Sequence, residues 1–395
     1  MEKLEIIESS EAMYDVIVLG AGIVGSSAAY QAQRAGNKTL LIEQFAFGHS
    51  LGSSHGGSRV IRHQYGNERM PEYAEWMPEA YEEWEHLEQV SGETLLNLTG
   101  GTSLFAKGHS PEACLENLRD NQVPHTLLTN EEATAKYPMI RFGSEIEWVL
   151  EEASMGAVYA DRCLRVTVEQ FIARGGVLKD GDQVVSIAEN SENGVVTVKT
   201  KKESFEGRKL IICAGTWINQ LLQPLGVKLD VKITKITICY WKETDDSMKM
   251  PTTQFHYDTN MYLIPEMEHK GYVKFLLHEG PEIENPEDSK RTDQEKNESV
   301  KQDMDCLKEA VKRKFPFLNP EPEFIDHCRY TMSPDAHFVL DKLPGYKNIV
   351  AGAAFSGHGF KMAPVSGKIL KHLALDESVK YNISKMNIQR LLVPL

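Results

Sequence analysis

Three glycines near the N-terminus have the spacing of a dinucleotide-binding turn. Gly20, Gly22 and Gly25 form the pattern GxGxxG directly after the apolar run 16–19. The first glycine of such a turn permits the tight bend, the second removes the Cβ that would block a pyrophosphate, and the third allows close packing of helix and strand. The phosphates would lie at the N-terminus of a helix that starts near Gly22, where free N–H groups and the helix dipole favour anions.

An acidic residue follows at the position where a nucleotide ribose would lie. Residues 40–42 predict a second buried strand, and Glu43 ends it. A carboxylate there can accept hydrogen bonds from both ribose hydroxyls of an adenosine and would repel a 2′-phosphate. Strand, helix and acid occur in the required order within about thirty residues, so we predict a dinucleotide site rather than a chance glycine-rich turn. The motif alone does not separate FAD from NAD.

The composition is that of an ordinary globular protein. The chain has 395 residues, of which 41% are hydrophobic and 25% charged, enough for two or three domains with sizeable cores. The net charge of −14 argues against nucleic acid and anionic membranes as main partners. No apolar run is long enough to span a bilayer, and we expect no membrane association.

The ends of the chain and its cysteines bear on the compartment. Residues 1–13 are acidic and lack the apolar core of a secretory signal, so we expect a flexible lead-in. Six cysteines without CxxC pairs predict a reduced protein with neither a zinc site nor a disulfide framework. The last three residues, 393–395, keep only the final leucine of an SKL-type peroxisomal signal. We therefore expect an intracellular protein of the cytoplasm or the peroxisome.

The elements that position these residues can be read from periodicity and turn signals. Two kinds of sequence pattern alternate along the chain. One is typical of short buried strands with amphipathic helices, and the other of longer strands with alternating polarity. The sequence predicts helices over 70–90, 130–137 with Asn130 as N-cap, 159–174, 299–315 and up to residue 373. It predicts buried strands over 209–214 and 349–353, strands of alternating character over 184–187 and 194–200, and a broken strand pair over 95–104. Antiparallel strands are expected over 231–241 and 262–277. A polar loop is expected over 281–298.

Several stretches together resemble one known family. They are GSSHGGSRVIRHQY, KFLLHEG, HCRYTMSPDAHFVLD and NIVAGAAFSGHGFKMAPVSGKIL, in that order, joined by ICYW and LLQPLG. The chain is similar to the monomeric sarcosine oxidases and the peroxisomal sarcosine and L-pipecolate oxidases, which are FAD-dependent amine oxidoreductases. The likeness runs from about Tyr14 to near the C-terminus. It implies FAD rather than NAD.

The resemblance implies an α/β flavoprotein of two domains. A Rossmann-like FAD-binding domain would comprise the segments 14–95, 155–226 and 333–390. A discontinuous second domain, built on a mostly antiparallel sheet, would comprise 96–154 and 227–332 and would carry the substrate. The polar segment 47–65, which on its own could be a solvated loop, would then reach along the cofactor.

Cys328 matches the cysteine that binds FAD covalently in this family. Its neighbours His327 and Arg329 are cationic residues of the kind that lower a thiol pKa. On the residues alone, a buried structural cysteine is the alternative. His327 is a departure from the family, in which small residues are more usual before this cysteine.

Two cationic residues match the family's carboxylate-binding pair, Arg62 and Lys361. An arginine can bind a carboxylate through two parallel hydrogen bonds, and a lysine adds a point charge. The alternatives are a surface or phosphate contact for Arg62 and a solvated lysine at a helix start for Lys361, where it would oppose the dipole. His55 and Arg59 match positions that line the flavin. The helix start after Gly357 would add positive potential at the flavin.

A third cationic residue, Lys274, matches the lysine that activates oxygen. A positive charge there would stabilise the negative charge that develops as O₂ takes up an electron; otherwise it is a solvent-facing lysine on a strand. His278 shares one side of an ideal strand with Lys274. Tyr262 and Tyr330 match tyrosines of the substrate cavity.

The activity implied is oxidation of a secondary amino acid, sarcosine and/or L-pipecolate, to an imine, with electrons passed to O₂ to give H₂O₂. The family also implies a monomer. N-methyltryptophan and glycated amino acids are alternative substrates. A flavin-dependent dehydrogenase that uses another electron acceptor, and an FAD-binding protein without catalysis, are alternative functions.

Overall fold

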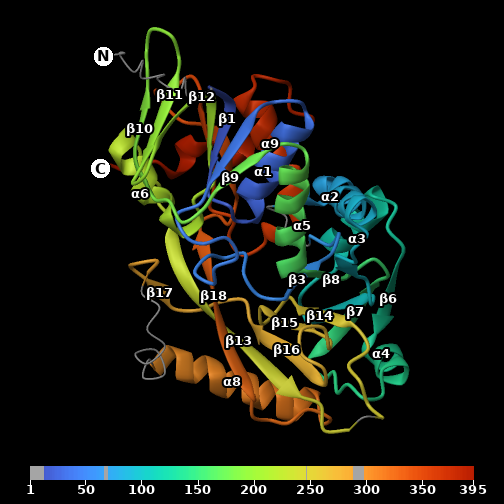
Figure 1. The fold of residues 1–395 in the computed structure, drawn as a ribbon. Helices are drawn as coiled ribbons and strands as arrows, with labels where there is room; N and C mark the ends of the chain where they lie inside the picture. The colour runs from blue at the N-terminus through green and yellow to red at the C-terminus, as the bar shows by residue number, and fades with distance from the viewer. Residues whose placement is uncertain (1–12, 66–69, 246, 288–297) are drawn as a thin grey trace, which may run out of the picture.

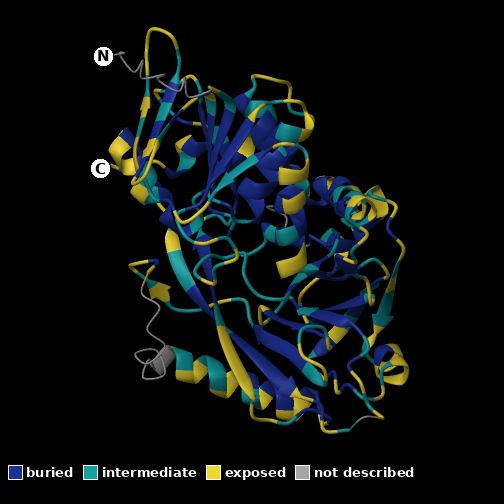
Figure 2. Ribbon diagram, in the orientation of Figure 1, coloured by how far each residue is buried: buried dark blue, intermediate teal, exposed yellow. Residues whose placement is uncertain are grey.

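The computed structural model describes residues 13–65, 70–245, 247–287 and 298–395. The predicted lead-in lies outside this part except for Met13, as does most of the polar loop expected over 281–298. Figure 1 shows two layered halves, one above the other, joined by the long strands β13 (Lys232–Lys242) and β18 (Phe324–Met332). The strands of both halves are largely buried (Figure 2).

The upper half is built on a mixed sheet whose centre is parallel. Strand β1 pairs in parallel with β2 on one side and with β12 on the other, which places the carboxyl ends of all three at one edge. The strand order is β10-β11-β12-β1-β2-β9, with β20 beside β12 and β19 beside β20. The bounds are β1 (Tyr14–Leu19), β2 (Thr39–Ile42), β9 (Val177–Lys179), β10 (Val184–Glu189), β11 (Val196–Thr200), β12 (Ser204–Ile212), β19 (Val339–Lys342) and β20 (Ile349–Ala353).

Both faces of this sheet are covered, as the continuous apolar strands require. Val16 and Val18 pack under the helices, whereas Ile17 and Leu19 enter the core on the opposite face. Helix α1 crosses α9 closely, because Gly367 of α9 leaves no room for a Cβ against the backbone of α1. The bounds are α1 (Ile23–Arg34), α2 (Pro71–Ser91), α5 (Ala160–Ala173), α6 (Ile218–Leu222) and α9 (Ala363–Ala374), with 3₁₀ turns η1 (Gly215–Trp217), η2 (Gln223–Leu225), η3 (Phe360–Met362), η4 (Ser384–Met386) and η5 (Ile388–Leu391).

The lower half is a mostly antiparallel sheet in the order β17-β13-β16-β15-β14-β5-β7-β6, with β18 beside β13. Only the pair β14 and β5 is parallel among the pairs described. One face packs on helix α8 (Glu298–Lys314), and the other faces the upper half. The other bounds are β5 (Gly101–Ala106), β6 (His125–Thr129), β7 (Ile146–Glu152), β14 (Thr253–His256), β15 (Met261–Ile264), β16 (Tyr272–Leu277), β17 (Glu282–Ile283), α3 (Glu112–Asp120) and α4 (Asn130–Lys136).

A small third sheet completes the fold. Strand β8 (Gly156–Tyr159) pairs with β3 (Ser58–Ile61) and with β4 (Leu96–Asn97). Strand β3 lies inside the polar segment 47–65 and carries Arg59, with Arg62 directly after its end. The third sheet therefore fixes the backbone of the segment that the sequence analysis associated with the cofactor.

The predicted fold class, an α/β flavoprotein fold with a mostly antiparallel second sheet, is confirmed. Two local expectations were wrong. The strands within 95–104 do not pair with each other, since β4 and β5 belong to different sheets. The N-cap of α4 is Thr129 rather than Asn130, because Thr129 and Glu132 form a reciprocal capping box. The domain boundaries stay a prediction; the first sheet takes its strands from 14–42, 177–212 and 339–353.

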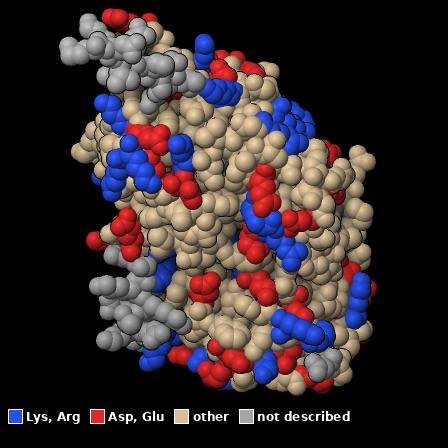
Figure 3. Space-filling model, in the orientation of Figure 1, with Lys and Arg blue, Asp and Glu red and all other residues tan. Residues whose placement is uncertain are grey.

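The surface carries acidic and basic side chains side by side over the face drawn in Figure 3. None of the helices described is both long enough and apolar enough to cross a bilayer.

Candidate active site

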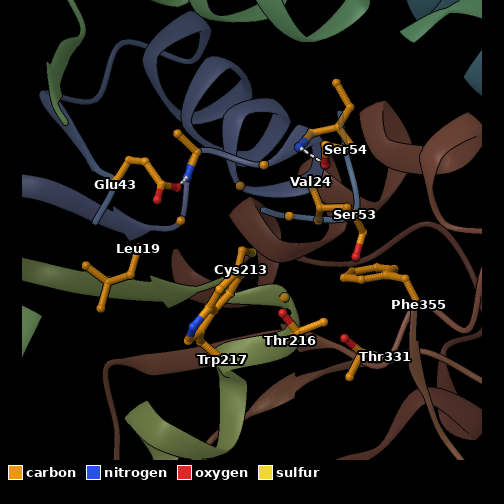
Figure 4. Close-up of a pocket in the computed structure, with 18 of the residues that line it drawn as sticks. Leu19, Val24, Glu43, Ser53, Ser54, Cys213, Thr216, Trp217, Thr331 and Phe355 are labelled. Carbon is orange, nitrogen blue, oxygen red and sulfur yellow. Dashed lines mark hydrogen bonds between the residues drawn. The ribbon is translucent and has the colours of Figure 1, made fainter. Parts of the chain in front are cut away.

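A cavity of about 300 Å³ lies at the carboxyl edge of β1, β2 and β12. It is lined by the glycine turn, the segment that follows Glu43, the residues after β12 and the segment 354–360 (Figure 4). The predicted cofactor residues Gly20, Gly22, Gly25, Glu43, His55, Arg59 and Gly357 all line it.

The glycines fit the cavity for different reasons. A Cβ on Gly20 would lie 2.3 Å from the carbonyl oxygen of Cys213, and its φ of +96° favours glycine. A Cβ on Gly25 would lie 2.0 Å from the carbonyl oxygen of Gly20. Gly22 is the N-cap of α1 and offers no side-chain cap; the N–H of Ile23 donates instead to Oγ of Ser54, at 3.0 Å, and the start of the helix lines the cavity. These are the conditions that a pyrophosphate at this turn needs.

Glu43 is fixed at the end of β2 by two backbone amides. Its Oε2 accepts from the N–H of Ala21 at 2.8 Å, and its Oε1 accepts from that of Phe45 at 3.0 Å. A carboxylate has about four acceptor sites, so it retains capacity for two ribose hydroxyls.

Two buried polar atoms of the cavity wall have no hydrogen-bond partner among the residues that the structure describes. They are the hydroxyl of Thr216 and the indole N–H of Trp217, both in η1 and both drawn in Figure 4. A buried donor without an acceptor is costly, so a polar ligand is expected to meet them. The cavity therefore fits FAD; the glycine turn and the start of α1 would hold the phosphates, and Glu43 would hold the ribose.

A second cavity of about 650 Å³ adjoins the first. Its wall carries several aromatic side chains, and the two cavities share five lining residues: Arg59, Tyr330, Ser356, Gly357 and Phe360. The predicted residues Arg62, Tyr262, His278, Tyr330 and Lys361 line the second cavity. Residues that lie up to 299 positions apart in the sequence are thus brought to one chamber beside the cofactor site.

Two basic residues of this chamber form no ion pair within the described residues, although Glu279 lines the same wall. The guanidinium of Arg62 lies 3.7 Å above the ring of Phe255, and its Nη1 is buried without a hydrogen bond. Lys361 lies in η3, is 7% exposed and donates only to the carbonyl oxygen of His358, at 3.2 Å, among the bonds described. Burial, followed by the charge of Arg62, holds the pKa of Lys361 well below its usual range. The pair is suited to an anion that comes from outside the protein.

The carboxylate of Glu152 holds the backbone that follows Arg62. It is 1% exposed and accepts from the N–H groups of His63, at 2.8 Å, and Gln64, at 3.3 Å. The orientation of Arg62 is thereby tied to β7, although Glu152 makes no ion pair with it.

The imidazole of His278 lies 3.1 Å from the hydroxyl of Tyr330. Burial lowers the pKa of His278 to about 3, and the charges of Lys361 and Arg62 contribute. Burial raises the pKa of Tyr330 well above its usual value, and that of Tyr262 to about 12. At neutral pH these three groups are uncharged, so the charge of the chamber depends on Arg62, Arg59, Glu279 and the protonation of Lys361.

Cys328 is 3% exposed and lies behind Arg59 rather than on a cavity wall. Its Sγ is 3.6 Å from Nη2 of Arg59 and 3.6 Å from the carbonyl oxygen of Ser53. The cation in contact with Sγ is therefore Arg59, and not the sequence neighbours His327 and Arg329. The latter point to the other face of β18, since side chains alternate along a strand.

Lys274 lies on the cavity side of β16 but lines neither cavity. Its Nζ lies 2.9 Å from Oε1 of Glu268, 3.1 Å from Oγ of Ser58 and 3.2 Å from the carbonyl oxygen of Ser58. The prediction did not include Glu268, because a glutamate in a polar connection carries no signal in the sequence. The roles of the site residues stay predictions.

Comparison with known proteins agrees with these observations. The sequence model of the FAD dependent oxidoreductase family matches residues 15–373. A peroxisomal sarcosine oxidase of Homo sapiens is 36% identical over 386 residues, which cover 96% of this chain and 96% of the human protein.

Two solved structures share the fold. NikD, an unusual amino acid oxidase essential for nikkomycin biosynthesis, has a TM-score of 0.80 at 20% identity and covers 97% of this chain and 98% of its own. An L-proline dehydrogenase from P. horikoshii also has a TM-score of 0.80 at 20% identity, with 96% and 97% covered.

Proposed function

Since this chain belongs to the FAD dependent oxidoreductase family, in the branch of the sarcosine oxidases, we propose that it is an oxidase of secondary amino acids. The expected substrates are L-pipecolate and sarcosine, and the expected electron acceptor is O₂, which would be reduced to H₂O₂. The observation that carries the proposal is the pair of buried cations, Arg62 and Lys361, without an acidic partner in the described part of the chain, in a chamber that adjoins the cofactor cavity.

The residues of the chamber act by binding and orientation. Arg62 and Lys361 hold the substrate carboxylate, the arginine through parallel hydrogen bonds and the lysine as a point charge. The aromatic wall, which includes Phe255 and Tyr257, packs on the carbon skeleton and excludes water from it. FAD, when bound, supplies the two-electron acceptor of the reaction.

The neutral pair of Tyr330 and His278 lies where it can contact the substrate amine. A secondary amine must be uncharged to be oxidised, and a neutral imidazole can accept the amine's proton, which an imidazolium could not. The carboxylate of the substrate neutralises Arg62 and Lys361, the two charges that contribute to the low pKa of His278. Binding of the substrate therefore makes His278 a better proton acceptor than it is in the free enzyme.

The size of the chamber favours a ring-bearing substrate. A volume of about 650 Å³ lies within the usual range for small-molecule sites and exceeds what sarcosine needs. We expect a higher kcat/KM for L-pipecolate than for sarcosine. N-methyltryptophan and glycated amino acids would also carry the required carboxylate beside a secondary amine.

The test is H₂O₂ release in air with L-pipecolate, sarcosine and piperidine. Piperidine has the ring and the amine of pipecolate without the carboxylate, so we expect no oxidation. Replacement of Lys361 with Met should raise KM for pipecolate at least about a hundredfold, since the charged contact is lost. The control is Lys199→Met, an exposed lysine of β11, which should leave KM unchanged. Oxidation of piperidine as fast as that of pipecolate would contradict the proposed binding of the substrate carboxylate by Arg62 and Lys361.

One observation favours a second function, an amino acid dehydrogenase. The three N–H groups of Lys274, the residue expected to assist O₂, are all directed at acceptors of the protein. Substrate-dependent reduction of an artificial electron acceptor without H₂O₂ would establish the dehydrogenase instead.

Within the proposed function we place the enzyme as a monomer of the cytoplasm or the peroxisome, with a small-molecule amino acid as its partner. Sedimentation velocity tests the first statement, and microscopy of the tagged full chain tests the second.

A further inference from the structure

A buried carboxylate that belongs to no sequence motif lies next to Lys274, the lysine predicted to assist the reaction with O₂. Glu268 is in the connection between β15 and β16, and its side chain is 10% exposed. Oε2 accepts from the N–H of Gly57 at 3.1 Å and from the hydroxyl of Tyr240 at 2.6 Å. Oε1 accepts from Nζ of Lys274 at 2.9 Å and from the hydroxyl of Ser58. Four donors from three separate strands or loops thus converge on one carboxylate.

The chain makes room for this carboxylate at Gly57. A Cβ on Gly57 would lie 2.5 Å from Cγ of Glu268, so a larger residue there would displace the glutamate. Gly57 immediately precedes β3, the strand that carries Arg59 in the wall of both cavities. Glu268 therefore joins the cavity wall to the lysine behind it.

The charges around Lys274 show what the carboxylate does. Arg59 repels its ammonium, the ring of Tyr240 lies 5.8 Å away, and Cys328 is the other titratable group that acts on it. Glu268 is the one acidic side chain that forms an ion pair with Lys274 in the described part of the chain. Two cations are thus held beside the cofactor cavity by one buried anion.

We propose that Glu268 is a positioning residue that keeps Lys274 charged and directed at Ser58, and thereby sets the charge beside the flavin. This inference rests on the proposed function, because it gives the predicted role of Lys274 a structural basis. Glu268 does not line either cavity, so it acts through Lys274 and not on the substrate.

The physical consequence follows from burial. Burial lowers the pKa of Lys274, and Glu268 opposes that effect. Burial by itself would raise the pKa of Glu268, but Lys274, Ser58 and Tyr240 lower it to about 2, so the carboxylate stays charged at all working pH values. Without the carboxylate, burial and Arg59 both favour a neutral Lys274.

The test compares the FAD-loaded wild type with Glu268→Gln, which keeps the size and removes the charge. The control is Glu266→Gln, the same change in the same connection, at an exposed glutamate near Lys249. The flavin is photoreduced, and its reoxidation by dissolved O₂ is followed between about pH 6 and pH 9. The midpoint potential of the bound flavin is measured over the same range. No amine substrate enters either measurement.

In Glu268→Gln we expect the reoxidation rate constant to fall about tenfold for each pH unit above the new pKa of Lys274, while wild type and Glu266→Gln stay level. The midpoint potential should be more positive than in wild type at low pH, because an anion is lost. The difference should vanish at high pH, when Lys274 has lost its proton. The proposal would be overturned if the reoxidation rate constant of Glu268→Gln did not change with pH and if its difference in midpoint potential from wild type did not depend on pH either.

A second comparison applies if Glu268→Gln does not fold. Lys274→Gln leaves the anion without its cation and should lower the potential, and the double variant Lys274→Gln/Glu268→Gln should restore it. Equal potentials in these two variants would overturn the proposal. Slow reoxidation of the wild type at every pH would instead count against the proposed oxidase activity, since the potentials test Glu268 independently of O₂.

Discussion

The guanidinium of Arg62 lies over the ring of Phe255, with Cζ 3.7 Å from the ring centroid. An arginine fixed in this way keeps its N–H groups free for an incoming carboxylate. The aromatic ring supports the guanidinium, as an acidic side chain of the protein would otherwise do. Within the described part of the chain Arg62 forms no ion pair, although Glu279 also lines the chamber.

Phe255→Leu removes this aromatic support and should weaken carboxylate binding. A cation–π contact contributes about 0.5–2 kcal/mol, so we expect the Kd of cyclohexanecarboxylate to rise about 2- to 30-fold. Isothermal calorimetry measures it without turnover. Phe324→Leu, at an exposed phenylalanine of β18, is the control. An unchanged Kd in Phe255→Leu would mean that Arg62 is held by its backbone alone.

Binding of a carboxylate should be linked to proton uptake by Lys361. Its pKa in the free enzyme lies well below the usual value, because of burial and of Arg62, and a bound carboxylate raises it. Between these two pKa values the complex holds more protons than the free enzyme, so affinity falls as the pH rises through this window. The neighbours that face Lys361 are Arg62, His278, His358 and Tyr65.

Calorimetry in two buffers of different ionisation enthalpy measures this uptake directly. The apparent enthalpy should differ between phosphate and Tris for wild type. The difference should disappear in Lys361→Met, which leaves the histidines in place. Identical enthalpies in both buffers at every pH would show that Lys361 is already charged in the free enzyme.

Much of the fold could be predicted, because it depends on local patterns. The run 16–19, the glycine turn and Glu43 specify a βαβ unit within one short segment, and β1, α1 and β2 form there. The N-cap of α4 was missed by one residue because Thr129 and Asn130 are both good caps. The pairing of β4 and β5 was missed because partners from distant segments, β8 and β7, compete for them.

The site could be predicted only through the family resemblance. Arg62 and Lys361 are far apart in the sequence, and no spacing rule brings a strand end of the N-terminal segment to a 3₁₀ turn before α9. Glu268 could not be predicted from the sequence by either route. It contacts Ser58, 210 positions away, from a polar connection whose sequence is typical of any surface turn.

Gly22→Ala should separate folding from FAD binding. Gly22 has a φ of −67°, which alanine adopts, and the new Cβ would lie 3.2 Å from Oγ of Ser54. The protein should fold but lose most of its FAD, because the Cβ occupies the space that a pyrophosphate needs. Far-UV circular dichroism and the ratio of flavin to protein absorbance check the two parts. Gly36→Ala has open space around it but a φ of +89°, so this variant should lose some stability and still keep its FAD.

Cys328→Ser tests whether the flavin is covalently attached. In the wild type we expect the yellow colour to stay with the protein after acid precipitation, and in Cys328→Ser to pass into the supernatant. The matched control is Cys213→Ser, because Cys213 is also buried and lines the cofactor cavity. His327 does not crowd the thiol, since it lies on the opposite face of β18. Arg59 is the cation in contact with this thiol, at 3.6 Å from Sγ. Retention of colour in Cys328→Ser with loss in Cys213→Ser would move the attachment to Cys213, and release from the wild type would exclude it at both.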